Sequence, residues 1–189
     1  KWLLRTAKEA GLDNFLYTHS VWVTPAFAKA HGIYGPMPES DTVSNFHNIQ
    51  YGPRIYPECG VVNDDTKRYT SGVFAEFAQL YQDLDGFYTD IGECLPGDKA
   101  AFFRDAIAPG LRRCGRKPMM IAIQWQVKLD SYLKNVAPKS VYDNTLLGFH
   151  GWNSEMITDA KPYPGLVAWM ESTGLPSVAI VYPANVTQF

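Results

Sequence analysis

The chain has 189 residues, of which 46% are hydrophobic and 19% charged, and its formal net charge is −2. This length is sufficient for one domain with a sizeable core, and the charge gives no indication of a nucleic acid or an anionic membrane as partner. No apolar run approaches the roughly 20 residues that a membrane-spanning helix needs. We therefore expect one globular domain over residues 1–189.

The two ends of the sequence predict that the chain is a piece of a longer protein. Residue 1 is Lys rather than Met, and a strand-like run stands close to the last residue. Three cysteines, Cys59, Cys94 and Cys114, show no metal-binding spacing. Their odd number leaves at least one thiol unpaired within the chain, so they do not define the redox compartment.

The first third of the chain predicts three short elements. The run Trp2–Ala10 has the pattern of an amphipathic helix, with Gly11 in the position of a helix-ending glycine. A strand is predicted over Phe15–His19, and Thr24-Pro25 has the pattern of a helix start. That helix would end at Gly32. Residues 33–66 show no clear period, which indicates either a long functional loop or elements that the pattern does not reveal.

A regular alternation begins after this loop. Apolar residues at helical spacing predict a helix over Thr66–Leu84. From there, strands and helices follow one another. The predicted strands are Gly86–Ile91, Met119–Trp125, Thr145–Phe149 and Ser177–Tyr182, and the predicted helices are Asp98–Arg113, Leu129–Val136 and Pro164–Ser172.

Five strands separated mostly by helices predict an α/β fold with parallel pairing and right-handed crossovers. The strands are nearly continuous apolar runs, as expected where both faces of a sheet are covered. A barrel of eight such units needs about 250 residues, so the chain fits either an open sheet or part of a TIM-barrel-like fold. Open sheets often carry a glycine-rich phosphate turn after the first strand, and its absence favours the barrel.

The residues that follow each strand are polar or aromatic. In both architectures, chemistry gathers where the parallel strands end, so these residues are the candidate site. They are Tyr17, Thr18 and His19; Asp90 and Glu93; Gln124, Trp125 and Gln126; His150, Trp152, Asn153 and Glu155; and Tyr182 and Asn185.

This set contains carboxylates but no serine-nucleophile or zinc-protease motif. Hydrolysis of a glycosidic bond needs two carboxyl groups, one to protonate the leaving oxygen and one to attack or to activate water. Glu93 is the candidate general acid, Glu155 its partner, and Asp90 the alternative partner. Asp90 could raise the pKa of Glu93 by like-charge repulsion. The competing interpretation is that each carboxylate caps a helix or pairs with a surface cation.

The remaining candidates would bind the sugar. Aromatic residues make up 14% of the chain, which indicates either a well-filled core or rings that stack on sugars. The candidate stacking platforms are Tyr17, Trp125, Trp152 and Tyr182, and the candidate hydrogen-bonding residues are His19, Gln124, His150 and Asn185.

The stretch 84–93, followed by the predicted helix through Arg113 and by Met120–Trp125, resembles the middle of a glycoside-hydrolase (β/α)8 barrel. It is most similar to the α-glucuronidase-like and hexosaminidase-like barrels of bacterial polysaccharide degradation. The resemblance covers roughly residues 80–185. It implies that the acid follows the fourth strand of the barrel, which here falls on Glu93, and that the chain is a fragment of a larger barrel.

Two other hypotheses stay open. One is a non-catalytic carbohydrate-binding module on the same scaffold. The other is a metal-dependent α/β hydrolase using His19, Asp90, Glu93 and His150, although their spacing is not that of a tight metal site. The leading hypothesis expects a carbohydrate substrate, no metal or other cofactor, no nucleic acid or membrane partner, and self-association if the barrel is incomplete. A polysaccharide-degrading enzyme would be secreted or periplasmic.

Overall fold

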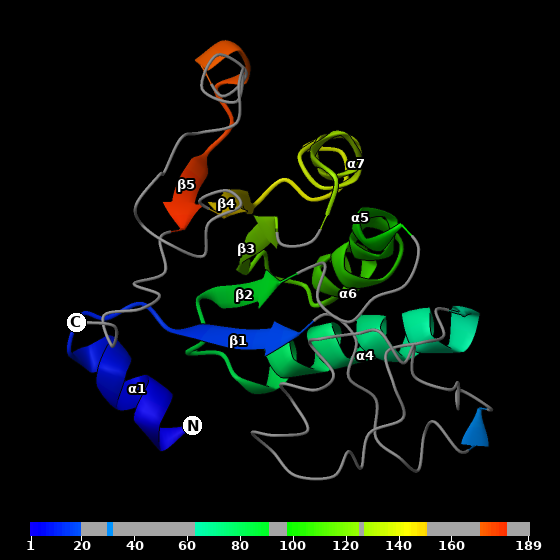
Figure 1. Cartoon of the computed structure of the whole chain (residues 1–189). Coiled ribbons are helices and arrows are strands. Elements are labelled where there is room, and N and C mark those ends of the chain that lie inside the picture. The colour runs from blue at the N-terminus through cyan, green and yellow to red at the C-terminus, as the bar shows by residue number, and fades with distance from the viewer. Residues whose placement is uncertain (20–29, 32–62, 91–97, 125–126, 151–170, 181–189) are drawn as a thin grey trace, which may run out of the picture.

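A computed structural model describes residues 1–19, 30–31, 63–90, 98–124, 127–150 and 171–180 (Figure 1). Its centre is one five-stranded sheet in which neighbouring strands pair in parallel, in the order β1-β2-β3-β4-β5. The strands are β1 (Phe15–His19), β2 (Gly86–Asp90), β3 (Met119–Gln124), β4 (Thr145–His150) and β5 (Ser177–Ile180). The predicted α/β class with parallel strands is confirmed.

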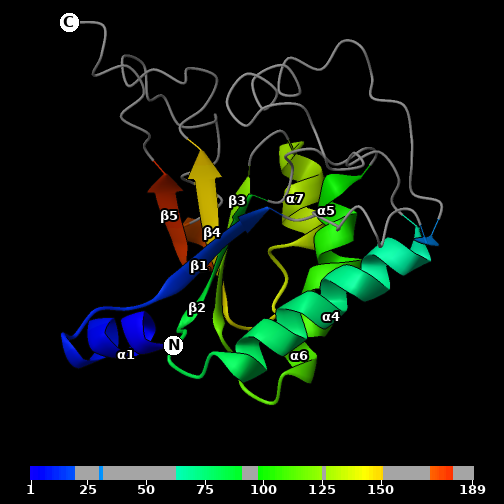
Figure 2. The same cartoon turned by 90° about the horizontal axis from the view of Figure 1, so that it is seen from below.

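Helices occupy the described parts of the connections from β1 to β4, as predicted, and α1 precedes β1. They are α1 (Trp2–Glu9), α4 (Asp64–Leu80), α5 (Lys99–Phe102), the π-helix η1 (Phe103–Ile107), α6 (Ala108–Arg113) and α7 (Leu129–Asn135). Figure 2 shows α4, α5, α6 and α7 on the same face of the sheet. The predicted helix after Thr24-Pro25, and most of the one predicted over Pro164–Ser172, lie outside the described residues.

Local capping explains where two of these helices begin. The Asn63 side chain accepts a hydrogen bond from the Thr66 backbone N–H at 2.9 Å, so α4 begins at Asp64, two residues before its predicted start. Asp98 caps α5 in the same way, through the Ala101 N–H at 3.1 Å. The predicted helix from Asp98 to Arg113 is continuous but contains the π-helical turn η1.

The core lies between the sheet and this helix layer. Phe87, Met120 and Leu147 come from alternate positions of successive strands, and each is at most 1% exposed. The Phe87 ring packs on Phe74 of α4, with 5.0 Å between the ring centroids. The buried Tyr132 hydroxyl of α7 donates to the Ala122 carbonyl at 2.6 Å, which ties that helix to β3.

The strand order never reverses along the chain. Crossovers between parallel strands share one hand, so moving steadily across a sheet places successive helices on one face. A doubly wound sheet reverses direction and has helices on both faces. Among the described strands β1 pairs only with β2, and β5 only with β4, so the sheet is open and a closed barrel is not observed.

The edge at which the strands begin, here called the amino edge, is tied together by side chains. The Asn14 backbone N–H donates to the Asp85 carboxylate at 2.8 Å. The Asn14 amide donates to the carbonyls of Leu4 and Asp83 at 2.9 and 3.0 Å. Lys8 of α1 also donates to Asp85. These bonds fix α1 and the start of β1 against the turn before β2.

Candidate functional site

The edge at which the strands end, here called the carboxyl edge, brings several predicted site residues together. β1, β2, β3 and β4 end at His19, Asp90, Gln124 and His150. His19 is the register partner of Asp90, and Asp90 that of Ile123, one residue before Gln124. Paired positions on neighbouring strands lie about 4.8 Å apart. The predicted convergence of strand ends at one edge is therefore present in the backbone.

Much of the predicted site lies outside the described residues. This is so for both glutamates of the candidate pair and for four of the binding residues, namely Glu93, Glu155, Trp125, Trp152, Tyr182 and Asn185. The side chains of His19, Asp90 and His150 are not described either. For these three residues the structure gives the backbone position at the carboxyl edge.

Tyr17 is the predicted stacking residue whose side chain is described. It is 49% exposed, and its ring lies against Tyr88 of β2, with centroids 5.4 Å apart and planes at 47°. The two residues are register partners on neighbouring strands. Because Phe87 and Thr89 on either side of Tyr88 are buried toward the helix layer, Tyr17 and Tyr88 lie on the opposite face of the sheet.

Gln124 ends β3 and is buried, with 2% of its surface exposed. Its amide nitrogen donates to the Val127 carbonyl at 2.5 Å. Its side-chain oxygen has no hydrogen-bond partner among the residues that the structure describes. A buried amide oxygen without a partner carries a desolvation cost of about 1–3 kcal/mol, so this oxygen has the capacity to accept a further hydrogen bond. Gln124 has the parity of Met120 and Ala122, so its side chain lies on the helix-layer side of the sheet.

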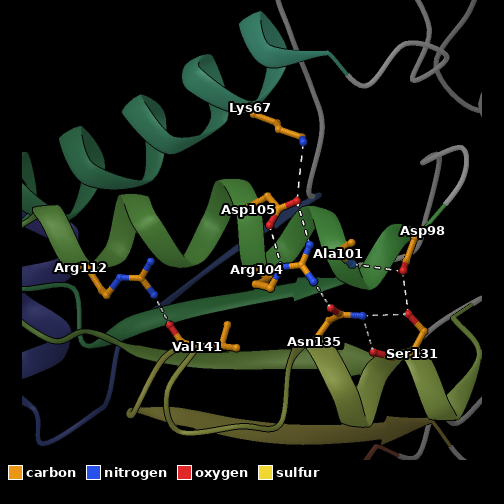
Figure 3. Close-up of polar contacts among 9 residues, drawn as sticks. All are labelled: Lys67, Asp98, Ala101, Arg104, Asp105, Arg112, Ser131, Asn135 and Val141. Carbon is orange, nitrogen blue, oxygen red and sulfur yellow. Dashed lines mark hydrogen bonds and ion pairs between the residues drawn. The ribbon is translucent and has the colours of Figure 1, made fainter.

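The helices that follow β2 and β3 are joined to each other and to α4 by a chain of polar contacts (Figure 3). Ser131 of α7 donates to Asp98 at 2.6 Å, and the Asn135 amide donates to Ser131. Arg104 of η1 donates to the side-chain oxygen of Asn135 and makes two hydrogen bonds to the Asp105 carboxylate. Lys67 of α4 also pairs with Asp105. We call this set of residues the inter-helix network: Lys67, Asp98, Arg104, Asp105, Ser131 and Asn135.

Two carboxylates of the inter-helix network are held in the charged form. The Ser131 hydroxyl lowers the pKa of Asp98, and the Ala101 N–H adds to this effect. The Arg104 guanidinium lowers the pKa of Asp105, with a further contribution from Lys67. In both cases hydrogen bonds and nearby cations favour the ionised carboxylate over its partial burial.

Sequence reasoning missed Tyr88 and Ser131. Tyr88 stands in the middle of a predicted strand, where alternation assigns it to the face opposite Phe87 but does not distinguish a core ring from an exposed one. Ser131 is an unremarkable residue inside a predicted helix. Its partner Asp98 is 33 positions away along the chain, and no local pattern relates the two.

Scans of protein-family models, curated proteins and solved structures found no match to this chain. Within the described ranges, no helix is both long and apolar enough to cross a membrane. The side chains that the structure describes also contain no cluster of three or more His, Cys, Asp or Glu suited to one metal ion. Because the comparisons give no relative, the fold class, a parallel α/β sheet wound in one direction, rests on the structure alone.

Proposed function

We propose that the chain is the strand-and-helix part of a barrel-type glycoside hydrolase, with its site at the carboxyl edge of the sheet. The observation that carries this proposal is the strand order. Five parallel strands follow one another without reversal, and their connecting helices α4 to α7 share one face. This is the winding of a (β/α)8 barrel, whose inner face is free of helices and whose reactions occur at the carboxyl ends of the strands.

The proposed catalytic pair is Glu93 as general acid and Glu155 as nucleophile or base, with Asp90 as the alternative partner. Glu93 follows β2 by three residues, and Glu155 follows β4 by five. Both strands end at the carboxyl edge, with β3 between them. Two strand ends with one strand between them lie about 10 Å apart, so side chains that follow them can converge at the opening of a barrel. A separation of about 5–9.5 Å between the carboxyl groups is what the two hydrolytic mechanisms require.

Tyr17 and Tyr88 support a carbohydrate ligand. Their rings lie on the face opposite α4 to α7 (Figure 2), which would be the inside of a barrel, and Tyr17 is half exposed. Aromatic rings with a few convergent polar groups are typical of small-molecule sites. The strand-end residues His19 and His150 would provide the hydrogen bonds to sugar hydroxyls, whereas Gln124, at the end of β3, has the parity of Met120 and Ala122 and lies on the helix-layer side.

The test is hydrolysis of a panel of aryl glycosides by the wild-type chain and by Glu93→Gln. A general acid contributes about 10²–10⁴-fold to rate, so we expect kcat to fall by at least 100-fold while ligand binding is retained. Glu76→Gln is the matched control, because Glu76 is exposed on α4 in the helix layer and undergoes the same chemical change. Unchanged turnover in Glu93→Gln would contradict the acid assignment.

The Tyr17–Tyr88 pair also fits a second function, a carbohydrate-binding module without catalysis. Titration of the wild-type chain with oligosaccharides separates the two. Binding that is lost in Tyr17→Ala, in a chain that hydrolyses none of the panel, would favour the module over the enzyme.

A further inference from the structure

The segments that follow two neighbouring strands are joined at their far ends. Asp98 is the last residue before α5 and closes the connection that leaves β2. Ser131 lies in the first turn of α7, just after the connection that leaves β3. The strands β2 and β3 are hydrogen-bonded neighbours. The 2.6 Å hydrogen bond from Ser131 to Asp98 therefore joins the starts of the two helices that follow these strands.

A buried side-chain amide, that of Asn135, holds Ser131 in position for its hydrogen bond to Asp98. Asn135 is 2% exposed, and both ends of its side chain are occupied. Its nitrogen donates to the Ser131 carbonyl at 3.0 Å and to the Ser131 hydroxyl at 3.2 Å, while its oxygen accepts from Arg104 at 2.5 Å. A satisfied buried amide between two helices restricts their relative rotation, because any turn of α7 leaves a buried polar group without a partner.

The same carboxylate oxygen of Asp98 serves both elements. It accepts from the Ala101 backbone N–H of α5 and from the Ser131 hydroxyl of α7. One atom thus caps the helix after β2 and anchors the helix after β3. A shift of either helix weakens a contact of the other.

We infer that Ser131 is a positioning residue that, through Asp98, holds α5, the helix after β2, in a fixed relation to α7, the helix after β3. The coupling of the two helices stands on the contacts of the inter-helix network alone. The role in positioning a site rests on the proposed function, because Glu93 belongs to the connection after β2.

The coupling is tested by amide hydrogen exchange in the full chain. Ser131→Ala removes no contact of the α5 backbone, yet we expect the Ala101 amide to exchange about fivefold faster because its acceptor loses an anchor. In the reverse direction, Asp98→Ala should speed exchange of the Tyr132 amide in the first turn of α7 by a similar factor. No change at Ala101 in Ser131→Ala would overturn the coupling.

Two further variants make the exchange measurement specific. Asp143→Ala removes a carboxylate that pairs with Lys117 at the amino edge, 2.5 Å away, and should leave the Ala101 and Tyr132 amides unchanged. Ser131→Thr keeps the hydroxyl and should restore slow exchange at Ala101. Equal acceleration in Asp143→Ala would show general destabilisation and overturn the coupling.

The positioning role is tested by steady-state kinetics on the aryl glycoside that the wild-type chain hydrolyses best. We expect Ser131→Ala to lower kcat about tenfold with KM changed less than twofold, since small misplacements of a reacting group affect the reaction more than binding. Ser131→Thr should recover kcat. An unchanged kcat alongside faster Ala101 exchange would overturn the positioning role and leave the coupling in place. A wild-type chain without glycosidase activity would overturn the proposed function and the positioning role together, while the exchange data still decide the coupling.

Discussion

At the amino edge of the sheet, polar side chains hold neighbouring turns together. The Asn14 N–H and amide bind Asp85 and two carbonyls, the Tyr142 hydroxyl donates to the Pro118 carbonyl at 2.7 Å, and the Asn144 amide donates to the Lys117 carbonyl at 2.8 Å. Apart from the bond from Asn14 to the Leu4 carbonyl, each bond joins residues that lie before two different strands. Arg116, before β3, donates to the carbonyls of Gln82 and Tyr81 before β2, so polar contacts run along the amino edge from β1 to β4, although the buried Arg116 Nε has no partner among the described residues.

The carboxyl edge differs in the chemistry of its strand ends. β1, β2 and β4 end in His19, Asp90 and His150, which are titratable residue types, and β3 ends in an amide. Among the described residues the Gln124 side-chain oxygen has no partner. The contact that we find between the connections is set back from the strands, at Asp98 and Ser131.

This difference indicates that the amino edge serves stability and the carboxyl edge serves function. In barrel-type folds the edge where strands begin maintains the fold, and the edge where they end carries the reaction. A polar group that is fully satisfied contributes to stability, whereas one with spare capacity costs free energy until a ligand satisfies it. We therefore expect substitutions at the amino edge to change stability and those at the carboxyl edge to change binding or turnover.

The largest effect is expected for Gly86→Ala at the amino edge. A Cβ atom at Gly86 would lie 2.2 Å from the Met119 carbonyl oxygen and 2.8 Å from the Phe15 ring. The first contact is with the backbone of β3 and cannot be relieved by a side-chain rotation, so β2 and β3 must separate locally. We expect a loss of about 3 kcal/mol in the free energy of unfolding, measured by urea denaturation.

Gly72→Ala is the matched control for this substitution. Gly72 lies inside α4, and a Cβ atom there would meet nothing within 4 Å. Alanine is favoured over glycine in a helix, so this variant should gain about 0.5–1 kcal/mol. Equal stability of Gly86→Ala and wild type would contradict the view that the amino edge is closely packed.

An intermediate effect is expected for Asp85→Asn, and it depends on pH. The Asn14 backbone N–H and the Lys8 ammonium lower the pKa of Asp85. A carboxyl group with a lowered pKa stabilises the fold above its unfolded-state value of about 3.9, and this stabilisation is lost as the pH falls through the lower folded-state value. At pH 7 the variant should be about 1 kcal/mol less stable, after allowance for partial exposure.

Urea denaturation at pH 7 and at several values below pH 4 checks this prediction. The difference between wild type and Asp85→Asn should shrink as the pH falls, because protonation of Asp85 removes the same charge that the substitution removes. Asp130→Asn, an exposed carboxylate on α7, serves as the control and should show little difference at any pH. A gap that grows on acidification would contradict the assigned role of the charge.

Most of the fold could be predicted from sequence because its elements have strong local signals. The strand Phe15–His19 was predicted with its observed bounds, since the turn residues Asp13-Asn14 precede it. The helix predicted from Asp98 was found with its cap, but its π-helical turn was not predicted, because no side-chain pattern signals η1. The order of the strands in the sheet could not be predicted from the sequence. β1 and β2 pair across a long connection, and periodicity carries no information on which strands pair.

The candidate site was predicted less completely, for a physical reason. Strand ends can be located from periodicity, so the convergence of His19 and Asp90 was foreseeable from parallel pairing. The stacking of Tyr17 on Tyr88 depends on register, which is a property of the folded sheet. The bridge between Asp98 and Ser131 depends on how two helices pack, and one sequence contains no signal for that.

The smallest effect on stability is expected at the carboxyl edge, for Gln124→Met. Methionine fills a similar volume, so the variant loses the bond to the Val127 carbonyl but also removes the buried oxygen that has no partner among the described residues. These terms nearly cancel, and the free energy of unfolding should change by less than about 1 kcal/mol. Oligosaccharide affinity, measured by calorimetry, should also change little, because Gln124 has the parity of Met120 and Ala122 and lies on the helix-layer side of the sheet, away from Tyr17 and Tyr88.

Gln82→Met provides the same chemical change at an exposed position before β2, where neither stability nor affinity should change appreciably. The two variants together sharpen the comparison between the edges. If the free energy of unfolding of Gln124→Met falls by about 2 kcal/mol or more, the polar groups of the carboxyl edge also stabilise the fold. Loss of affinity at nearly constant stability would instead place ligand recognition at the end of β3, because the spare acceptor would then be satisfied by the ligand and not by the fold.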